Sequence, residues 1–333
     1  MITKANNENY SQVKGLIIDT DLGNDIDDSL AMLVAYSLES AGECNILGVA
    51  VNKGNYYTAL YADILNTFYG RSELEIGIAR DGKTPNDGPF ARAVAESKVD
   101  GEYKYPRSRT VFEMPAVDMY RKLLANAADD SVVIVSIGFL TNLAALLESG
   151  PDSYSELSGA ELAAKKVSLL SVMAGNFSDV AKDECGNAGA EYNIRYDIPA
   201  AQTVCRHWPG ETVFSGVEVG KQILYPARSI EDDFSWAEHH PVVDGYNLFK
   251  KMPYDRPTWD LTSVLYAVRP GDGYFDISRP GRVEVDDAGI THFKEKPHGT
   301  HKYLIVNPDK INDVKTLLVR LCSRNPETAQ VCL

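Results

Sequence analysis

The segment that most constrains this chain is an acidic turn placed between an apolar run and a helical pattern. Apolar residues at 15–18 precede it and apolar residues at 30–34 follow it, which predicts a strand, a turn and then a helix. Within ten positions the turn carries five carboxylates, at Asp19, Asp21, Asp25, Asp27 and Asp28. Because like charges this close repel one another, a folded chain tolerates them best around a hard cation with oxygen ligands. We therefore expect a metal or catalytic site here, since a solvated loop with one carboxylate at a helix start would explain only one or two of them.

Further apolar runs recur along the chain, and several are followed by helical spacing. The runs lie at 46–51, 132–137, 167–173 and 212–217, and the helical patterns lie at 57–68 and 140–147. Continuous apolar strands that alternate with helices indicate a parallel sheet covered on both faces. We predict an α/β fold in one domain over residues 1–333, with a core at about 15–322 and a Rossmann-like open sheet. Sites in such sheets form at the carboxyl ends of strands, where the acidic turn lies.

Two stretches rich in Pro, Gly and charge are expected to be long loops, at 84–109 and at 230–257. The later part of the chain is expected to contain a strand at 282–285, a turn at 286–289, a last strand at 303–306 and a helix at about 310–322.

Charge and cysteine content limit the function classes. The formal net charge is −14, from 33 Lys and Arg against 47 Asp and Glu, which argues against binding nucleic acid or an anionic membrane through bulk charge. There is no apolar leader core and no apolar run near the ~18 residues of a membrane span, so we expect a soluble protein, with the cytoplasm favoured. A secreted or periplasmic location after removal of a leader stays open. Reduced thiols are expected, and a disulfide between Cys322 and Cys332 stays open.

An Asp-x-Asp element at the end of a first strand has two chemical uses. In phosphoryl transfer, Asp19 would attack, Asp21 would assist and Mg²⁺ would be held nearby, as in enzymes that resemble the haloacid dehalogenase class. In the other use, calcium holds a ribose. The segments further along the chain distinguish the two.

Those segments resemble the inosine-uridine-preferring nucleoside hydrolase family. The turn matches the two ends of the family's Asp-x-Asp-Pro-Gly-x-Asp-Asp-Ala-x-Ala pattern, with two additional residues between them and Leu22 in place of the proline. Asp25 therefore has no assigned counterpart. The later matches, in order, are Gly54-Asn55, residues 137–142 (Ile-Gly-Phe-Leu-Thr-Asn), residues 173–175 (Met-Ala-Gly), Asn187 with residues 190–194 (Ala-Glu-Tyr-Asn-Ile) and 197–201 (Asp-Ile-Pro-Ala-Ala), and Trp259-Asp260.

The resemblance implies a role for each matched position. Ca²⁺ would be held by Asp21, Asp28, Asp260 and the backbone carbonyl of Ile137, and Asp21 would also be the general base on the metal-bound water. The substrate-binding residues would be Asp27, Asn55, Met173, Asn187, Glu191 and Asn193. Other interpretations stay open for several of them: Asn55 and Asn187 suit turns, Asp260 suits a helix N-cap and Met173 suits a core.

Trp259 departs from the pattern, because the family usually has a histidine before the aspartate. An indole donates a hydrogen bond but is no acid near neutral pH, so the leaving base must be activated from elsewhere or weakly. Trp259 is expected to line the substrate site and could stack on an aromatic base. The nearby candidates for activation are His239, His240, Tyr246, Tyr254, Asp255 and Arg256.

We therefore expect Ca²⁺-dependent hydrolysis of a ribonucleoside to free base and ribose, through an oxocarbenium-like transition state. One alternative is a ribosyl-binding protein with weak or no turnover, and another is a Mg²⁺-dependent phosphatase that uses Asp19. The expected partner is a small ribonucleoside, with no nucleic acid and no membrane. Family members are often dimers or tetramers, so a homo-oligomer is compatible with the resemblance.

Overall fold

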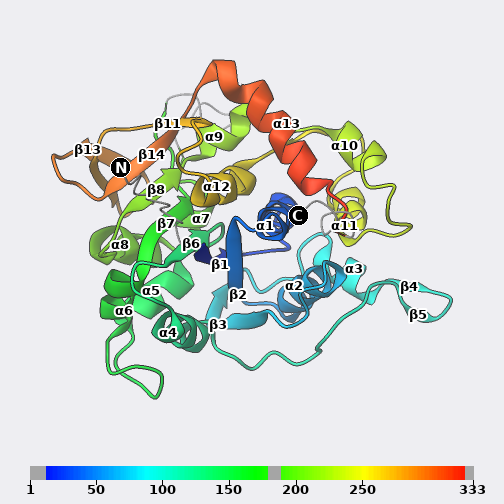
Figure 1. Cartoon of the computed structure of the whole chain (residues 1–333), viewed down its shortest axis with the longest axis horizontal. Helices are drawn as coiled ribbons and strands as arrows, with labels where there is room; N and C mark the ends of the chain where they lie inside the picture. Colours follow the sequence, from blue (N-terminus) through cyan, green and yellow to red (C-terminus); the bar gives the residue numbers. More distant parts are fainter. Residues whose placement is uncertain (1–12, 179–188, 327–333) are drawn as a thin grey trace, which may run out of the picture.

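A ten-stranded, mainly parallel sheet forms the centre of the structure, a computed structural model that describes residues 13–178 and 189–326 (Figure 1). The strand order is β13-β12-β14-β8-β7-β6-β1-β2-β3, and β11 pairs with β14. From β14 through to β3 each neighbouring pair is parallel, whereas β11, β12 and β13 join in antiparallel fashion at one end. The strands are β1 (Lys14–Thr20), β2 (Cys44–Lys53), β3 (Glu75–Lys83), β6 (Val132–Ser136), β7 (Val167–Met173), β8 (Thr212–Ser215), β11 (Phe275–Ile277), β12 (Gly281–Val285), β13 (Thr291–Glu295) and β14 (His301–Val306).

Helices cover both faces of this sheet, because its central strands are apolar on both sides. In β1, Leu16 and Ile18 belong to one buried cluster and Ile17 belongs to the other, as the alternation of side chains along a strand requires. The first face carries α1 (Asp27–Ser40), α2 (Tyr56–Phe68), α12 (Trp259–Val268) and α13 (Ile311–Cys322). The second carries α4 (Ala116–Asn126), α5 (Thr141–Glu148), α6 (Gly159–Lys166) and α8 (Ile198–His207), which gather at the lower left of Figure 1.

The predicted α/β fold with a mainly parallel sheet is confirmed, but the two expected long loops were wrong. Residues 84–109 contain α3 (Ala91–Glu96) and a hairpin of β4 (Lys98–Val99) and β5 (Glu102–Tyr103). Residues 230–257 contain most of α10 (Ala227–Asp232), all of α11 (Pro241–Phe249) and β10 (Arg256–Pro257), which pairs with β9 (Leu224–Tyr225). These elements are short, so their apolar spacing is too brief to stand out from the Pro, Gly and charged residues around them.

The carboxyl ends of β1, β6 and β7 lie side by side, and this places the segments that follow them around one site. Gly138, after β6, approaches the first of these segments so closely that a Cβ atom would lie 2.4 Å from the backbone nitrogen of Asp21. Only glycine permits that approach, and it brings residues 137–139 against the acidic turn.

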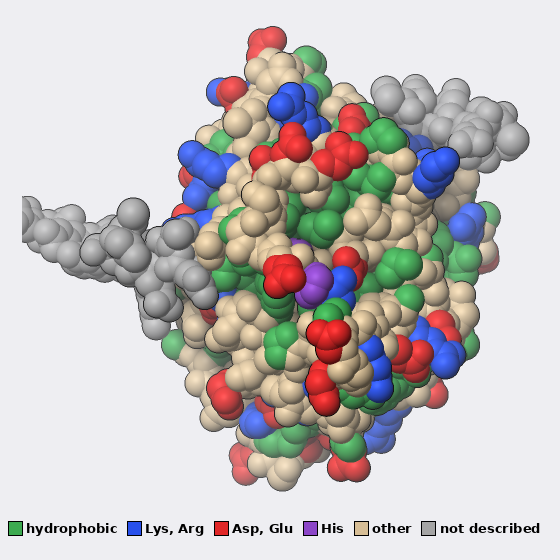
Figure 2. All heavy atoms as spheres, turned by 90° about the vertical axis from the view of Figure 1, so that its right-hand side faces the viewer, with side chains coloured by type: hydrophobic (Ala, Val, Ile, Leu, Met, Phe, Trp, Pro, Cys, Tyr) green, Lys and Arg blue, Asp and Glu red, His purple; other side chains and the backbone are tan. Residues whose placement is uncertain are grey.

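The surface is mixed rather than basic on the face that carries α10 and α11. Figure 2 shows acidic, basic and hydrophobic side chains interspersed over this face, without a continuous basic patch. Among the described residues, Cys44, Cys205 and Cys322 are buried free thiols, while Cys332 lies outside the described residues. No described helix is long and apolar enough to cross a membrane.

Candidate active site

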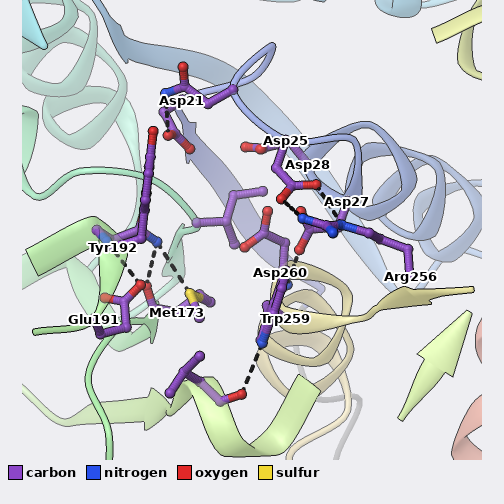
Figure 3. A pocket seen from close by; sticks show the side chains of 14 residues that line it. Asp21, Asp25, Asp27, Asp28, Met173, Glu191, Tyr192, Arg256, Trp259 and Asp260 are labelled. Carbon is purple, nitrogen blue, oxygen red and sulfur yellow. Dashed lines mark hydrogen bonds and ion pairs between the residues drawn. The ribbon is translucent and has the colours of Figure 1, made fainter. Parts of the chain in front are cut away.

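A cavity of about 290 Å³ lies at the carboxyl ends of the parallel strands, and it gathers most of the side chains singled out from the sequence (Figure 3). Its walls come from the β1–α1 turn, the ends of β6 and β7, the segment that enters α7 (Tyr192–Arg195), the start of α9 (Val217–Gln222) and the β10–α12 junction. The lining residues are Asp21, Asn24, Asp25, Asp27, Asp28, Ile137, Met173, Glu191, Tyr192, Asn193, Val217, Arg256, Trp259 and Asp260.

The acidic turn holds its shape through short polar contacts. The Thr20 hydroxyl donates to the Asp28 carboxylate and accepts from the Leu22 backbone N–H at 3.0 Å. The Asn24 amide donates to Asp21 Oδ2 at 2.7 Å, which fixes the orientation of that carboxylate. Ile26, the residue that precedes α1, makes no side-chain cap, so the N-cap of α1 is not an aspartate. Asp27 and Asp28 instead occupy the first helical turn, where the helix dipole favours negative charge.

Three buried carboxylates meet on one wall of the cavity. Oxygen atoms of Asp27, Asp28 and Asp260 all lie within 4.8 Å of one another, and each residue is at most 4% exposed. The backbone N–H of Asp260 donates to Asp27 Oδ2 at 3.2 Å, which ties α12 to α1 across 233 positions of sequence. Burial, together with repulsion from the neighbouring aspartates, raises the pKa of all three carboxyl groups well above the usual range. This arrangement of hard oxygen donors could hold a metal ion.

Asp21 lies in the same cavity but outside this closest group of three. Burial raises its pKa to about 6, and the hydrogen bond from Asn24 and the charge of Lys53 act in the opposite direction. Ile137, whose carbonyl was expected to be a metal ligand, also lines the cavity.

The opposite wall presents a carboxylate and an amide. Glu191 caps α7: its side chain accepts from the backbone N–H groups of Asn193 at 2.9 Å, Ile194 at 3.2 Å and Gly175 at 3.3 Å. Burial raises the pKa of Glu191 to about 7 in spite of these donors. The Asn193 amide donates to the Met173 carbonyl at 2.9 Å, so β7 and α7 position each other's cavity-lining side chains.

Trp259 and Arg256 form the side of the cavity next to the carboxylate trio. The indole Nε1–H of Trp259 donates to the Val217 carbonyl of α9 at 2.9 Å. The Arg256 guanidinium lies over the indole ring with 5.0 Å to its centroid. Arg256 also forms a two-point ion pair with Asp25, in which Nε donates to Oδ1 at 2.9 Å and Nη2 donates to Oδ2. Asp25, which had no assigned position in the family pattern, is thus a cavity residue with a defined partner.

Of the described candidate residues, Asn55, His239, His240 and Asp19 do not line this cavity, and neither do Tyr246, Tyr254 and Asp255. Asn55 is the N-cap of α2, where its side chain accepts from the Tyr57 N–H and donates to the Pro85 carbonyl, so it is a helix cap with extended backbone and not the turn residue left open for it. His239 is partly exposed, and His240 is buried with Nε2 2.9 Å from the Tyr69 hydroxyl. Burial lowers the pKa of His240 to about 3, so it is neutral at physiological pH. Asn187 lies outside the described residues.

Asp19, another of these, is fully buried on the far side of the turn. Its carboxylate accepts from Asn52 Nδ2 at 2.6 Å and from the Tyr120 hydroxyl at 2.7 Å. Burial raises the pKa of Asp19 to about 7. It contributes to the packing of β1 against β2 and α4, and it is not placed as a nucleophile.

The sequence did not single out Asn24, Tyr192 or Lys53, and it gave Arg256 only as one of several nearby candidates. Asn24 is a cavity residue inside the acidic turn, and the spacing of three residues between Asp21 and Asn24 is compatible with the hydrogen bond between them. Arg256 pairs with a residue 231 positions away, and no local pattern signals such a contact.

The fold and the site together define an α/β protein with an acidic small-molecule pocket at the carboxyl ends of parallel strands. The model of the inosine-uridine preferring nucleoside hydrolases matches residues 16–316. The chain therefore belongs to this family, and the resemblance drawn from its sequence is confirmed.

Solved structures share the fold of this chain. The chain is similar to a plant nucleoside hydrolase, the PpNRh1 enzyme, with a TM-score of 0.70, 19% identity, and 94% of this chain and 99% of that chain covered. It is also similar to a purine-preferring ribonucleoside hydrolase from Gardnerella vaginalis, with a TM-score of 0.70, 20% identity, and coverage of 93% and 99%. An uncharacterized protein of Schizosaccharomyces pombe, C1683.06c, is 31% identical over 196 residues, which span 57% of this chain and 56% of that relative.

Proposed function

We propose that this chain hydrolyses the N-glycosidic bond of a ribonucleoside to free base and ribose. The observation that carries the proposal is the buried trio Asp27, Asp28 and Asp260, which shares one small cavity with Glu191 and Asn193 in a nucleoside hydrolase family chain. Carboxylate and amide oxygens around a sugar bind its hydroxyl groups. They also favour the positive charge that builds on the ribose ring as the glycosidic bond breaks.

The two walls divide the work of binding the sugar. Asp27 on one wall and Glu191 on the other accept hydrogen bonds from the ribose hydroxyls, and so does the amide oxygen of Asn193. Met173 provides an apolar surface beside the ring. All four positions are set by contacts within the chain, such as the Asn193 amide bond to the Met173 carbonyl. A site fixed in this way orients the ribose without reorganising when the substrate binds.

Asp21 is the general base in this proposal. Its pKa of about 6 leaves it ionised at neutral pH, and the Asn24 amide holds the carboxylate in one orientation. Asp21 takes the proton of an attacking water while the water oxygen bonds to C1′ of the ribose. The C1′–N bond breaks, and its electron pair goes to the departing base.

The donor set fits Ca²⁺, which takes six to eight oxygen ligands. We assign Asp28, Asp260, Asp21 and the Ile137 carbonyl as its ligands, and Asp27 belongs to the closest group of carboxylate oxygens as well. A bound Ca²⁺ would supply positive charge that favours the ionised carboxylates, acidifies water and orients ribose hydroxyls.

One observation favours a second candidate, a ribosyl-binding protein with little turnover. The indole N–H of Trp259 is already committed to the Val217 carbonyl, so Trp259 offers the leaving base no donor. The phosphatase alternative has no such support, because Asp19 is enclosed outside the cavity.

The test is the release of reducing sugar from a panel of inosine, adenosine, guanosine, uridine, cytidine and 5-methyluridine, with added Ca²⁺ and with a chelator. We expect ribose release from at least one nucleoside, and we expect the chelator to abolish it. Nucleoside binding by calorimetry without any product would favour the binding protein. A chain that neither binds a nucleoside nor releases product from one would overturn both candidate functions.

A further inference from the structure

The cavity lacks the expected acid for the leaving base, because Trp259 occupies the position where the family usually has a histidine. An indole does not transfer its proton near neutral pH, and this indole already donates to the Val217 carbonyl at 2.9 Å. The Arg256 guanidinium lies over one face of the ring, so a base that enters the cavity can stack only on the other face, and the N–H is not available to it. Any stabilisation of the departing base must therefore come from another side chain of the cavity.

Arg256 is the one cationic side chain among the described residues that line the cavity. Six carboxylates share this lining with it: Asp21, Asp25, Asp27, Asp28, Glu191 and Asp260. Its guanidinium is held over two aromatic rings, at 5.0 Å from the Trp259 centroid and 4.9 Å from the Phe249 centroid. The position of the charge is thus fixed next to the indole, as a binding site for a flat, electron-rich group requires.

The ion pair with Asp25 leaves part of the guanidinium free for a ligand. Nε donates to Oδ1 and Nη2 donates to Oδ2, so two of the three nitrogens are engaged. Among the described residues, the hydrogen bonds of the guanidinium come from Nε and Nη2, and none comes from Nη1. The Arg256 side chain keeps one fifth of its surface accessible. Two N–H donors of a permanently charged group are therefore available beside the Trp259 ring.

We propose that Arg256 is a catalytic residue that binds the leaving base, with Nη1 donating to a carbonyl oxygen of a base stacked on Trp259. The inference rests on the proposed hydrolysis and specifies its substrate class. As the C1′–N bond breaks, the electron pair passes to the base, which leaves as an anion. The guanidinium keeps its proton and stabilises the negative charge on the carbonyl oxygen. The water oxygen bonds to C1′, its proton goes to Asp21, and the base anion takes a proton from solvent afterwards.

This chemistry selects bases that can depart as anions and that carry an oxygen beside the glycosidic nitrogen. Uracil meets both conditions, because its negative charge is shared with the carbonyl next to N1. Adenine fails the second condition, because it carries no carbonyl to which the guanidinium could donate. We therefore expect uridine to be hydrolysed faster than adenosine.

Asp25 acts as a positioning residue in this scheme. It lies in the turn that is two residues longer than the family pattern, and its Oδ1 also accepts from the Ile26 backbone N–H at 2.6 Å. This contact fixes the carboxylate at the start of α1, and the carboxylate in turn fixes the plane of the guanidinium. The longer turn and Arg256 thus form one unit, although 231 residues separate them.

The experiment compares kcat/KM of the full chain, with Ca²⁺ added, on uridine and on 4-nitrophenyl β-D-ribofuranoside. Nitrophenolate is stable enough to leave without help. The rate of its release therefore depends on sugar binding and on attack by water, but not on stabilisation of the leaving group. Arg256→Gln should lower kcat/KM on uridine by about 100-fold, a typical loss for one donor aimed at developing charge, and should change it by less than about three-fold on the nitrophenyl riboside. Arg256→Lys, which restores the charge, should recover part of the loss on uridine alone.

Two further variants keep the test decisive. Arg228→Gln, on the exposed side of α10, is the matched control and should leave both rates unchanged. Asp25→Asn leaves the Arg256 guanidinium in place but weakens the ion pair that fixes its orientation. This variant should lower kcat/KM on uridine but not on the nitrophenyl riboside, and it provides a test even if Arg256→Gln folds poorly. Equal losses on both substrates in the Arg256 and Asp25 variants would make the pair structural and overturn the inference. A wild-type chain that releases ribose from neither substrate would instead overturn the proposed function itself.

Discussion

Lys53 Nζ lies 2.6 Å from the side-chain oxygen of Asn24, and the amide of the same Asn24 lies 2.7 Å from Asp21 Oδ2. The lysine is 2% exposed and also donates to the Thr84 carbonyl at 2.6 Å. Asp21, the residue that we propose as the general base, is therefore oriented through Asn24 by a buried cation that does not itself line the cavity. The two hydrogen bonds from Lys53 to Asn24 and from Asn24 to Asp21 connect the end of β2 to the β1–α1 turn.

Replacing Lys53 by Met should weaken both stability and activity. The loss leaves the Asn24 and Thr84 oxygens without their donor, which we expect to lower the free energy of unfolding by about 2 kcal/mol. Asn24 would then be free to turn away from Asp21, and kcat should fall by about ten-fold. Urea denaturation and ribose release measure the two effects. Lys122→Met, which removes a partly exposed ion pair with Glu75, is the control. Equal activity in the Lys53 and Lys122 variants would argue against an effect of Lys53 on Asp21 through Asn24.

Asp28 is the side chain on which the metal assignment depends most. Asp28→Ala should abolish Ca²⁺ binding, measured by calorimetry, and should reduce ribose release by at least about 100-fold. Asp309→Ala removes an exposed carboxylate from the short 3₁₀ helix before α13, and it should change neither Ca²⁺ binding nor ribose release. An Asp28→Ala chain that stays active would show that the trio with Asp27 and Asp260 is not a metal site.

Substitution of Asp19 tests whether this buried carboxylate stabilises the fold or acts as a nucleophile. Asp19→Asn places an amide opposite the Asn52 amide, so we expect the free energy of unfolding to fall by about 1–3 kcal/mol. Because Asp19 faces away from the cavity, the folded variant should keep at least about a tenth of the wild-type kcat, whereas loss of a nucleophile would cost several orders of magnitude. Turnover by the variant should be measured at a temperature where circular dichroism shows it folded.

His240 should make stability depend on pH in a known direction. Burial lowers its pKa in the folded protein from 6.5 to about 3, so the unfolded chain binds the proton first as the pH falls. The stability associated with the neutral imidazole is therefore complete above about pH 6.5 and declines toward pH 3. Between pH 7 and pH 4 the wild type should lose roughly 3 kcal/mol more than His240→Asn, which can still cap α11. Urea titrations at several pH values test this, with His239→Asn as control, and parallel curves for wild type and His240→Asn would contradict it.

Trp259→His should raise the turnover of inosine, because it supplies the acid that this cavity lacks. General acid catalysis contributes at least about 100-fold in favourable geometry. We expect a gain of only about ten-fold here, because the substitution also removes the hydrogen bond from the indole N–H to the Val217 carbonyl, which helps to position this segment. Steady-state kinetics with inosine and uridine provide the measurement. A rate of inosine hydrolysis that is unchanged or lower would contradict the view that a missing acid limits the turnover of this purine nucleoside.

The fold was predictable because its signal is local and repeated. Runs such as 132–137 and 167–173 are long and continuously apolar, and β6 and β7 occupy them almost completely. The short elements α3, α10 and α11 were missed because each depends on tertiary contacts: Ala91 and Val94 of α3, for example, are buried against the rest of the chain.

The site was predictable for those residues whose position next to a strand end or a helix start can be recognised in the sequence. Asp21, Asp27, Asp28 and Asp260 reach the cavity because each follows directly on a strand or begins a helix. Asn55 was expected near the sugar from a two-residue match, but its side chain turns toward the loop at 85–87. The Arg256–Asp25 pair follows from tertiary geometry alone, which no spacing in one sequence encodes.

The tie between the Asp260 backbone and Asp27 has a consequence for synthesis of the protein. On the ribosome, the acidic turn emerges more than two hundred codons before its partner on α12, and contacts of such separation form slowly. A nascent or truncated chain presents Asp27 and Asp28 without the third carboxylate. A cation that is bound by the carboxylates of Asp27, Asp28 and Asp260 together can therefore be bound only by the complete, folded chain. The affinity of the cavity for such a cation would thus also measure how much of the protein has folded completely.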